Sequence, residues 1–333
     1  MPATLPLNQL PSWQEQLADL ISDPLVLLEM LDLSPAQVGF SELALREFPL
    51  RVPRGYAALM ERGNPLDPLL LQVLPASAEL LDLPGYEADP LGEMEATVVP
   101  GLLHKYQGRV LLIVTQACAI HCRYCFRRHF PYAENRQSRA QWETALRYIA
   151  EREDIREVIL SGGDPLASSN QHLAWLLSRL RDIAHIKRIR LHTRLPIVLP
   201  DRVDDALLDL LNDDTRQIVM VLHANHANEI SPQVAQACRS LRSTGLTLLN
   251  QTVLLKGINN SAVTLGKLSE VMFAAGVLPY YLHLPDPVKG TAHFVIHETE
   301  AQAIISRLQA TLPGYLVPRL VVEVAGRPAK TPL

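Results

Sequence analysis

From residue 109 onward, apolar and β-branched runs alternate with amphipathic stretches of helical period. Six runs have the length and composition of strands: 109–115, 157–163, 188–193, 217–223, 246–255 and 279–284. Between them lie helical patterns such as 138–154 and 231–245, the second closed by Gly245. Six β-α units predict a parallel sheet with right-handed crossovers, arranged as a partial or complete barrel or as an open, doubly wound sheet.

The first hundred residues follow a different pattern. Residues 13–22 place Trp13, Leu17, Leu20 and Ile21 on one helical face, and 34–48 starts with an N-capping serine and a proline, so short helices are expected. Residues 75–103 are rich in proline and acidic residues and lack periodicity, which indicates a wrapping segment. We therefore expect three parts: an N-terminal helical and wrapping segment (1–103), a β/α core (104–295), and a C-terminal helix, strand and tail (296–333).

Composition narrows the class of protein. The chain has 333 residues, 48% of them hydrophobic, and a formal net charge of −4, so it can bury a large core, and its acidic balance disfavours nucleic acid as a partner. Neither a secretory leader pattern nor an apolar run of the roughly 20 residues needed to cross a bilayer is present, so no membrane partner is expected. Three of the four cysteines are clustered, which is typical of a metal or catalytic site in a reducing compartment. The expected location is the cytoplasm.

Polar residues gather where the predicted strands end. In parallel α/β folds the chemistry lies at the carboxyl ends of the strands. The residues expected there are Thr115, Ser161, Gly162, Gly163, Asp164, His192, Arg194, His223 and Asn225.

The cysteine cluster directly follows the first strand of the core. Cys118, Cys122 and Cys125 have the spacing C-x3-C-x2-C. A structural zinc site needs a fourth ligand, for which His121 and His129 are the candidates, although His121 lies between two cysteines and cannot easily converge with both. An iron–sulfur cube held by three cysteines instead leaves one iron open to a substrate or cofactor. The fourth cysteine, Cys238, falls on the apolar face of a predicted helix and is expected in the core.

This loop resembles the signature of the radical S-adenosylmethionine (SAM) superfamily, with Tyr124 at the aromatic position before the third cysteine. The resemblance implies a partial (β/α)6 TIM-like barrel in which Cys118, Cys122 and Cys125 hold a [4Fe-4S] cluster. The open iron binds SAM, and an electron cleaves SAM to methionine and a 5′-deoxyadenosyl radical. A reduced flavodoxin- or ferredoxin-type protein is the implied electron donor.

A second segment carries the same resemblance. "SGGDP", beginning at Ser161, resembles the glycine-rich segment that meets the SAM amino group in this superfamily. The resemblance makes Ser161, Gly162, Gly163 and Asp164 cofactor-binding residues, with Asp164 offering a carboxylate to the ammonium. Glycines allow close backbone approach. Without the cysteines, the segment would be an ordinary strand-to-helix turn.

Nearly the whole chain resembles lysine 2,3-aminomutase and its relatives. The matching segments are "DPLGE", "VPGLLHKYQGRVLLIVTQACAIHCRYCFRR", "VILSGGDPL", "RLHTRLPIVLPDRV", "NQTVLLKGINN", "PYYLHLPDPVKGTAHF" and "AGRPAKTPL". The family uses SAM together with pyridoxal 5′-phosphate (PLP) to move the α-amino group of L-lysine to the neighbouring carbon. The resemblance therefore implies an isomerase that converts L-α-lysine to (R)-β-lysine.

The resemblance also assigns roles to single residues. Lys330 matches the lysine that binds PLP as a Schiff base, and Arg127 matches the arginine that binds the substrate carboxylate. Asp286 and Glu323 match the acidic pair that holds the ε-ammonium. Positions that contact PLP in the family correspond to Lys105, Tyr106, Arg109 and Gln251.

Two departures from the family pattern are visible. Glu323 stands where lysine enzymes usually have Asp, and the added methylene displaces that carboxylate by about one bond length. Arg327, Pro328 and Ala329 replace a richer glycine run before Lys330. The first departure bears on which substrate the protein accepts, and the second bears on the geometry of the tail near the cofactor.

The short tail resembles bacterial enzymes that make (R)-β-lysine for attachment to elongation factor P by a partner ligase. Longer relatives carry extra cysteines in the tail that bind zinc between subunits, so no zinc is expected here. A homo-oligomer is compatible with the sequence. The alternatives are a radical SAM aminomutase acting on another amino acid or on a protein-attached lysyl group, and a binding module whose cysteines hold a structural metal.

Overall fold

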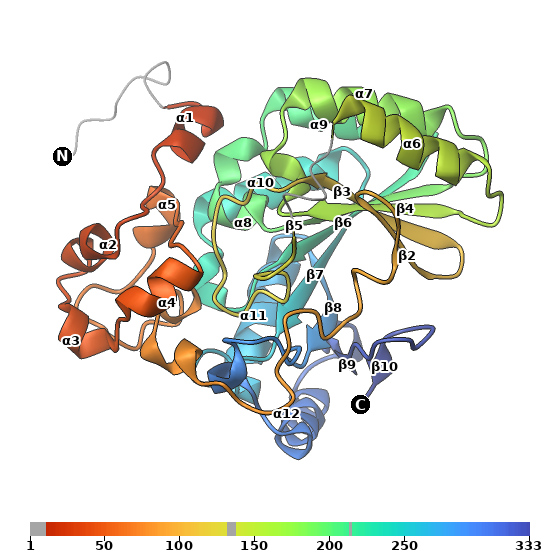
Figure 1. The fold of residues 1–333 in the computed structure, drawn as a ribbon. Coiled ribbons are helices and arrows are strands. Elements are labelled where there is room, and N and C mark those ends of the chain that lie inside the picture. Colours follow the sequence, from red (N-terminus) through yellow and green to blue (C-terminus); the bar gives the residue numbers. More distant parts are fainter. Residues whose placement is uncertain (1–10, 132–137, 213–214) are drawn as a thin grey trace.

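A computed structural model describes residues 11–131, 138–212 and 215–333. In that part of the chain, one sheet of ten strands runs in sequence order from β1 to β10 (Figure 1). The strands are β1 (Thr97–Val99), β2 (Leu102–Tyr106), β3 (Arg109–Thr115), β4 (Glu157–Gly162), β5 (Arg188–Thr193), β6 (Gln217–His223), β7 (Thr247–Val253), β8 (Leu278–His283), β9 (Arg319–Val322) and β10 (Thr331–Pro332).

The strands of the core are parallel. Pairing is parallel from β3 through β9, and antiparallel between β1 and β2, β2 and β3, and β9 and β10. A doubly wound sheet reverses its strand order, whereas a barrel keeps sequence order, so the sequential order identifies a TIM-like barrel. Because the described chain places β1 and β10 at opposite ends of the sheet, the barrel is partial. All six predicted strands form, and β9 adds a seventh parallel strand.

The strand register aligns one apolar layer across the barrel. Leu112, Leu160, Leu191, Met220 and Leu248 are neighbours on successive strands, and each is at most 3% exposed. Side chains alternate faces along a strand, so this layer packs outward against the helices and the intervening positions face the barrel interior. The barrel is thereby fixed in register from β3 to β7.

Helices cover the outside of the barrel (Figure 1). They are α6 (Arg139–Ala150), α7 (Asn170–Arg181), α8 (Leu195–Val198), α9 (Asp205–Leu211), α10 (Pro232–Ser243), α11 (Ala262–Ala274) and α12 (Glu298–Thr311). The serines at 138, 169, 231 and 261 cap α6, α7, α10 and α11, because each hydroxyl accepts a backbone N–H of the first turn. Cys238 lies on the buried face of α10 and is 0% exposed, so its predicted core role is confirmed.

From residue 11 onward, the described N-terminal part forms five short α-helices beside the barrel (Figure 1). They are α1 (Trp13–Ala18), α2 (Pro24–Met30), α3 (Pro35–Val38), α4 (Glu42–Glu47) and α5 (Arg54–Ala57). Gly39, at a φ of 62°, separates α3 from α4. The predicted helical face that included Leu20 and Ile21 is wrong beyond Ala18, because Ile21 leaves the helix and pairs with Val52.

The wrapping segment lies across the C-terminal part of the barrel. Glu87 forms a bridge with Val288: its N–H donates to Pro287 O at 3.0 Å, and its carbonyl accepts the N–H of Lys289 at 3.0 Å. The segment also contains the 3₁₀ helix η3 (Ser77–Leu80) and strand β1, which its lack of periodicity had concealed.

The division of the chain at residues 103 and 295 stays a prediction, and residues 1–10 of its first part lie outside the described residues. Across the described ranges, every helix is too short or too polar to cross a lipid bilayer.

Candidate active site

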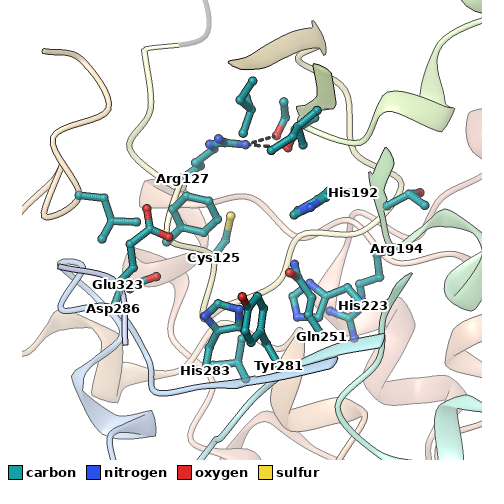
Figure 2. Close-up of a pocket in the computed structure, with 18 of the residues that line it drawn as sticks. Cys125, Arg127, His192, Arg194, His223, Gln251, Tyr281, His283, Asp286 and Glu323 are labelled. Carbon is teal, nitrogen blue, oxygen red and sulfur yellow. Dashed lines mark hydrogen bonds between the residues drawn. The ribbon is translucent and has the colours of Figure 1, made fainter. Parts of the chain in front are cut away.

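A cavity of about 470 Å³ opens at the carboxyl ends of the strands (Figure 2). All the residues predicted to bind metal, cofactor or substrate line it. They are Lys105, Tyr106, Arg109, Cys118, Cys122, Tyr124, Cys125, Arg127, Ser161, Gly162, Gly163, Asp164, Gln251, Asp286, Glu323 and Lys330. The fold therefore brings together residues drawn from β2 to the chain's last turn.

The glycine run after β4 supports the cysteine loop. A Cβ on Gly162 would lie 2.5 Å from Thr115 O, and one on Gly163 would lie 2.5 Å from Ala117 O. The N–H groups of Gly163 and Asp164 donate to these same two carbonyls, each at 2.8 Å. Only glycine allows this approach, so the run is required to seat the loop.

The three cysteines are half-buried, and their thiolates would repel one another. Burial, followed by the charge of Cys125, raises the pKa of Cys118 well above its usual range. Burial and Cys122 raise the pKa of Cys125 to about 11. A cationic iron centre would remove this cost by stabilising the thiolates, so the donor set fits an iron–sulfur cluster.

The two histidines considered as zinc ligands are engaged elsewhere. Nδ1 of His121 lies 2.7 Å from Pro49 O, and the ring stacks on Phe48. Nε2 of His129 lies 3.0 Å from Lys289 O. Among the described residues, no group of three or more His, Cys, Asp or Glu side chains is arranged to hold a single metal ion.

The Asp164 carboxylate accepts four hydrogen bonds from neighbouring residues of the fold. Its Oδ1 accepts Thr193 Oγ1 at 2.6 Å and Leu166 N at 3.0 Å. Its Oδ2 accepts the N–H groups of Arg194 at 2.7 Å and Leu195 at 3.0 Å. Asp164 thus ties the glycine turn to the start of α8, and its role towards a SAM ammonium stays a prediction.

Arg127 is engaged by a carboxylate that the sequence analysis did not single out. Its Nε and Nη2 donate to the two oxygens of Glu93 at 2.7 and 2.8 Å, and Nη1 donates to Ser161 Oγ at 3.0 Å. Both members of this ion pair are buried. The fork expected to bind a substrate carboxylate thus holds Glu93, and its substrate role stays a prediction. The acidic end of "DPLGE" was the available signal for Glu93.

Glu323 lies at the centre of a cationic cluster. It accepts Lys330 Nζ at 2.5 Å, Lys105 Nζ at 3.2 Å and the Tyr106 hydroxyl at 3.0 Å. Burial raises the pKa of Glu323, but Lys330 and Lys105 outweigh it and bring the pKa to about 2. This carboxylate is therefore ionised at neutral pH.

The Asp286 carboxyl differs from that of Glu323 both in its hydrogen-bond partners and in the direction of its pKa shift. Its buried Oδ1 has no hydrogen-bond partner among the described residues. Burial, and then the charge of Glu323, raises the pKa of Asp286 to about 7. A buried carboxyl with an unused oxygen is a site for an incoming cation.

The β9–β10 hairpin brings Lys330 into the cavity. Thr331 pairs with Val322, which returns Lys330 to the side of Glu323 seven residues earlier. Gly326, at a φ of 75°, makes the turn, and the residues at 327–329 are exposed. The departure from the family's glycine run thus falls on the exposed arm of the hairpin.

Other residues, some predicted from the sequence and some not, line the rest of the cavity. The Arg109 guanidinium lies 4.6 Å from the centre of the Tyr106 ring. Gln251 lies on β7, two residues before its end (Figure 2). Besides Glu93, the sequence analysis missed Arg190 and His283. His283 ends β8 and obeys the same strand-end rule that identified His192 and His223. Burial lowers the pKa of His283 to about 3, so its ring is neutral.

Comparisons with known proteins identify the relatives of this chain. The radical SAM superfamily model matches residues 112–264. An L-lysine 2,3-aminomutase of Escherichia coli (strain K12) is 50% identical over 322 residues, covering 96% of this chain and 94% of that protein. One of Haemophilus influenzae is 48% identical over 320 residues, covering 96% and 95%. The solved structure of a radical SAM methyltransferase from Sphaerobacter thermophilus aligns with 66% of this chain and 68% of its own, at a TM-score of 0.45 and 17% identity.

Identity of this extent over nearly full length establishes the family. Membership implies a [4Fe-4S] cluster and SAM as cofactors. The chain therefore belongs to the L-lysine 2,3-aminomutase family of the radical SAM superfamily, isomerases that move an amino group within one substrate molecule.

Proposed function

We propose that the protein is a PLP-dependent aminomutase that converts L-α-lysine to (R)-β-lysine. The observation that carries the proposal is the convergence of three thiols, a lysine amine and two differently charged carboxyls on one cavity. Each group matches a requirement of the reaction.

The metal-binding side of the cavity is the cysteine loop. Cys118, Cys122 and Cys125 would hold the [4Fe-4S] cluster, which when bound supplies the electron for reductive cleavage of SAM. The glycine run keeps the loop in place, and the buried walls keep water from the reacting centre.

The PLP-binding side is the β9–β10 hairpin. Lys330 would hold PLP covalently, and the bound cofactor supplies the electrophile that carries the migrating nitrogen. Glu323, which is ionised, accepts a hydrogen bond from the Lys330 amine at 2.5 Å and so positions that amine in the cavity. Lys105, Tyr106 and Arg109 supply cationic and hydroxyl groups suited to a phosphorylated cofactor.

The acidic end of the cavity supports a substrate with a cationic side chain. Asp286 offers a buried oxygen without a hydrogen-bond partner among the described residues, and Glu323 in the same cavity would supply a second carboxylate for a cationic group. A substrate with an acidic side chain would meet two carboxyls here and is disfavoured.

The biological role we propose is supply of (R)-β-lysine to a ligase that attaches it to elongation factor P, with a reduced flavodoxin- or ferredoxin-type donor. The clustered free thiols suit a reducing compartment, so we place the reaction in the cytoplasm. The support is the family likeness and the acidic end of the cavity.

The test is anaerobic incubation of the cluster-loaded protein with SAM, PLP, dithionite and L-lysine, followed by chiral chromatography. (R)-β-Lysine is the expected product. Parallel reactions contain L-glutamate, or elongation factor P already carrying an α-lysyl group. A protein with four irons per chain that leaves lysine unchanged contradicts the proposal, and turnover of only the protein-attached group redirects it to that substrate.

A further inference from the structure

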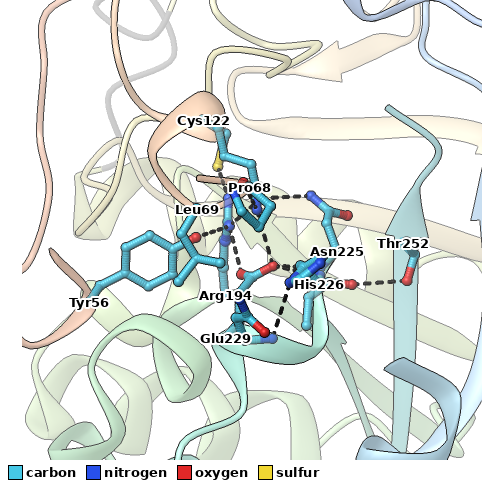
Figure 3. A network of polar contacts seen from close by, with 12 residues as sticks. Tyr56, Pro68, Leu69, Cys122, Arg194, Asn225, His226, Glu229 and Thr252 are labelled. Atoms are coloured by element: carbon cyan, nitrogen blue, oxygen red, sulfur yellow. Dashed lines mark hydrogen bonds and ion pairs between the residues drawn. The ribbon is translucent and has the colours of Figure 1, made fainter. Parts of the chain in front are cut away.

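A buried polar network lies directly beneath the cysteine loop (Figure 3). Its residues come from the N-terminal segment, from the loop itself and from the ends of β5 and β6, and they are Tyr56, Gln72, Cys122, Tyr124, Arg194, Asn225 and Glu229. Arg194 and Glu229, at its centre, have no role in the cofactor and substrate contacts proposed above, whereas Cys122 belongs to the proposed cluster site.

Arg194 lies at the centre of the network, and its two terminal nitrogens have different hydrogen-bond partners. Nη2 faces Glu229, Gln72 and Tyr56, at 2.8, 2.7 and 3.2 Å. Nη1 donates to Cys122 Sγ at 2.7 Å and to the Tyr124 hydroxyl at 2.5 Å. The two hydrogens of Nη1 are thereby fully used, one of them on a thiol of the metal-binding motif.

The charge of Arg194 is balanced by Glu229. This carboxylate is 0% exposed, and besides Arg194 it accepts the N–H groups of Asn225 at 2.8 Å and His226 at 2.9 Å. Cys122 therefore faces a buried cation whose counter-charge lies on the far side of the guanidinium.

This arrangement acts on the electron affinity of a bound cluster. The potential of an iron–sulfur cluster depends on net charge, burial and hydrogen bonds to its sulfurs, and arrangements that stabilise added negative charge raise it. A guanidinium N–H directed at a ligating sulfur does this, and a nearby carboxylate opposes it.

We infer that Arg194 is a positioning and tuning residue that raises the reduction potential of the cluster held by Cys118, Cys122 and Cys125, and that Glu229 lowers it. The inference rests on the proposed cluster site. It goes beyond that site because it assigns the control of electron uptake to two residues that have no proposed contact with SAM, PLP or substrate.

The experiment is a mediated redox titration of the reconstituted protein, followed by the electron paramagnetic resonance signal of the reduced cluster, without SAM, PLP or substrate. We expect the midpoint potential of R194Q to shift to more negative values and that of E229Q to shift to more positive values. R194K, which keeps the charge but not the fork, falls between wild type and R194Q.

Potential shifts of opposite sign in R194Q and E229Q would show that the two residues act on the cluster through their charges and not merely by holding the loop in place. Both substitutions disturb the same network, so loosening of the loop would move both potentials in one direction. The matched control is Y56F, which removes a neighbour of Arg194 but neither the charge nor the N–H to sulfur, and it leaves the potential at the wild-type value.

Iron and sulfide analysis distinguishes failure of the inference from failure of the proposed function. A wild-type protein that takes up no cluster contradicts the cluster site itself. With four irons per chain, shifts of equal sign in R194Q and E229Q, or no shift in either, overturn the inference. Should R194Q not hold its cluster, E229Q alone decides: a more positive potential supports the inference and any other value overturns it.

Discussion

Single residues set the charge of the cavity, and the two acidic residues at its substrate end are in opposite electrostatic situations. Glu323 is already neutralised by two lysines, whereas Asp286 keeps an unused oxygen. Selection of a cationic substrate should therefore depend more on Asp286 than on Glu323.

Replacement D286N removes the charge that we propose faces the substrate ammonium. A hydrogen bond to a charged group contributes about 1.5–3 kcal/mol, so kcat/KM for lysine should fall roughly 10- to 100-fold, mostly through KM. Steady-state kinetics measure this, with D209N as a control of equal charge change at an exposed helix position. An unchanged KM in D286N would remove Asp286 from the substrate site.

The pH profile provides a second test of Asp286. Burial and Glu323 raise its pKa to about 7, so below this pH the carboxyl is neutral and cannot pair with an ammonium. The value of kcat/KM should therefore rise as pH increases through about 7 and then level off. In D286N this rise should vanish; a rise that persists belongs to another group.

Lys330 and Lys105 contact the same carboxylate, but only Lys330 is proposed to bind PLP covalently. Borohydride reduction of the PLP-loaded protein followed by peptide mass spectrometry should place the label on Lys330. The label should be lost in K330R and kept in K105R, which changes the neighbouring amine. Label on Lys105 would assign the cofactor lysine differently.

At the scale of elements, the junction of the cysteine loop with the turn after β4 is the most constrained part of the site. The two glycines lie against carbonyl oxygens of the loop, which are backbone atoms and cannot rotate away. Packing strain at this junction should therefore be transmitted to the thiols.

Replacement G163A tests this junction. The new methyl group would lie 2.5 Å from Ala117 O, so the loop must shift, at a cost of roughly 1–3 kcal/mol. We expect a lower melting temperature and less than half the wild-type iron content after reconstitution. G55A is the control, because a Cβ there meets nothing within 4 Å. Wild-type iron content in G163A would show that the loop has room to move.

The elements that the sequence predicted best are those with a strong period. Strands β5 and β6 were predicted to the residue because their apolar runs end at turn-forming or polar positions. Strands β1 and β2 were missed, since β1 has three residues and a register shift interrupts its pairing. Such short strands form because a neighbouring strand provides backbone hydrogen-bond partners, and the local sequence carries no signal of that pairing.

At the scale of the whole molecule, the wrapping segment connects the N-terminal helices to the cavity. Three of its acidic residues are fixed: Glu79 to Arg123 and Arg128, Glu87 to the loop after Asp286, and Glu93 to Arg127. Three of these contacts reach arginines that flank Cys125. The segment is therefore part of the site and not only a linker.

Replacement E79Q should destabilise the whole chain. The Glu79 side chain and both of its arginine partners are 0% exposed, and breaking a buried ion pair costs about 3–5 kcal/mol. Urea unfolding measures the loss. The control E42Q removes an exposed pair with Arg46, whose side chains are 78% and 79% exposed, and should change stability by less than about 1 kcal/mol. Equal effects of the two substitutions would contradict the structural role of Glu79.

Contacts between distant residues mark the limit of the sequence analysis. The motifs located the thiols, the lysine and the acidic pair, because each has a local spacing or a family match. The pairing of Glu93 with Arg127 and of Arg194 with Cys122 spans 34 and 72 residues, and no periodicity connects such positions. These contacts form only when the barrel folds and brings the ends of its strands together.

The hairpin that carries Lys330 also has a consequence for biosynthesis. The ribosome makes the cysteine loop and its glycine support long before β9 and β10, so this loop can fold before Lys330, the lysine proposed to bind PLP, has been synthesised. Under the proposed function, cluster assembly can thus begin on the nascent chain, whereas attachment of the vitamin-derived cofactor has to wait for Lys330.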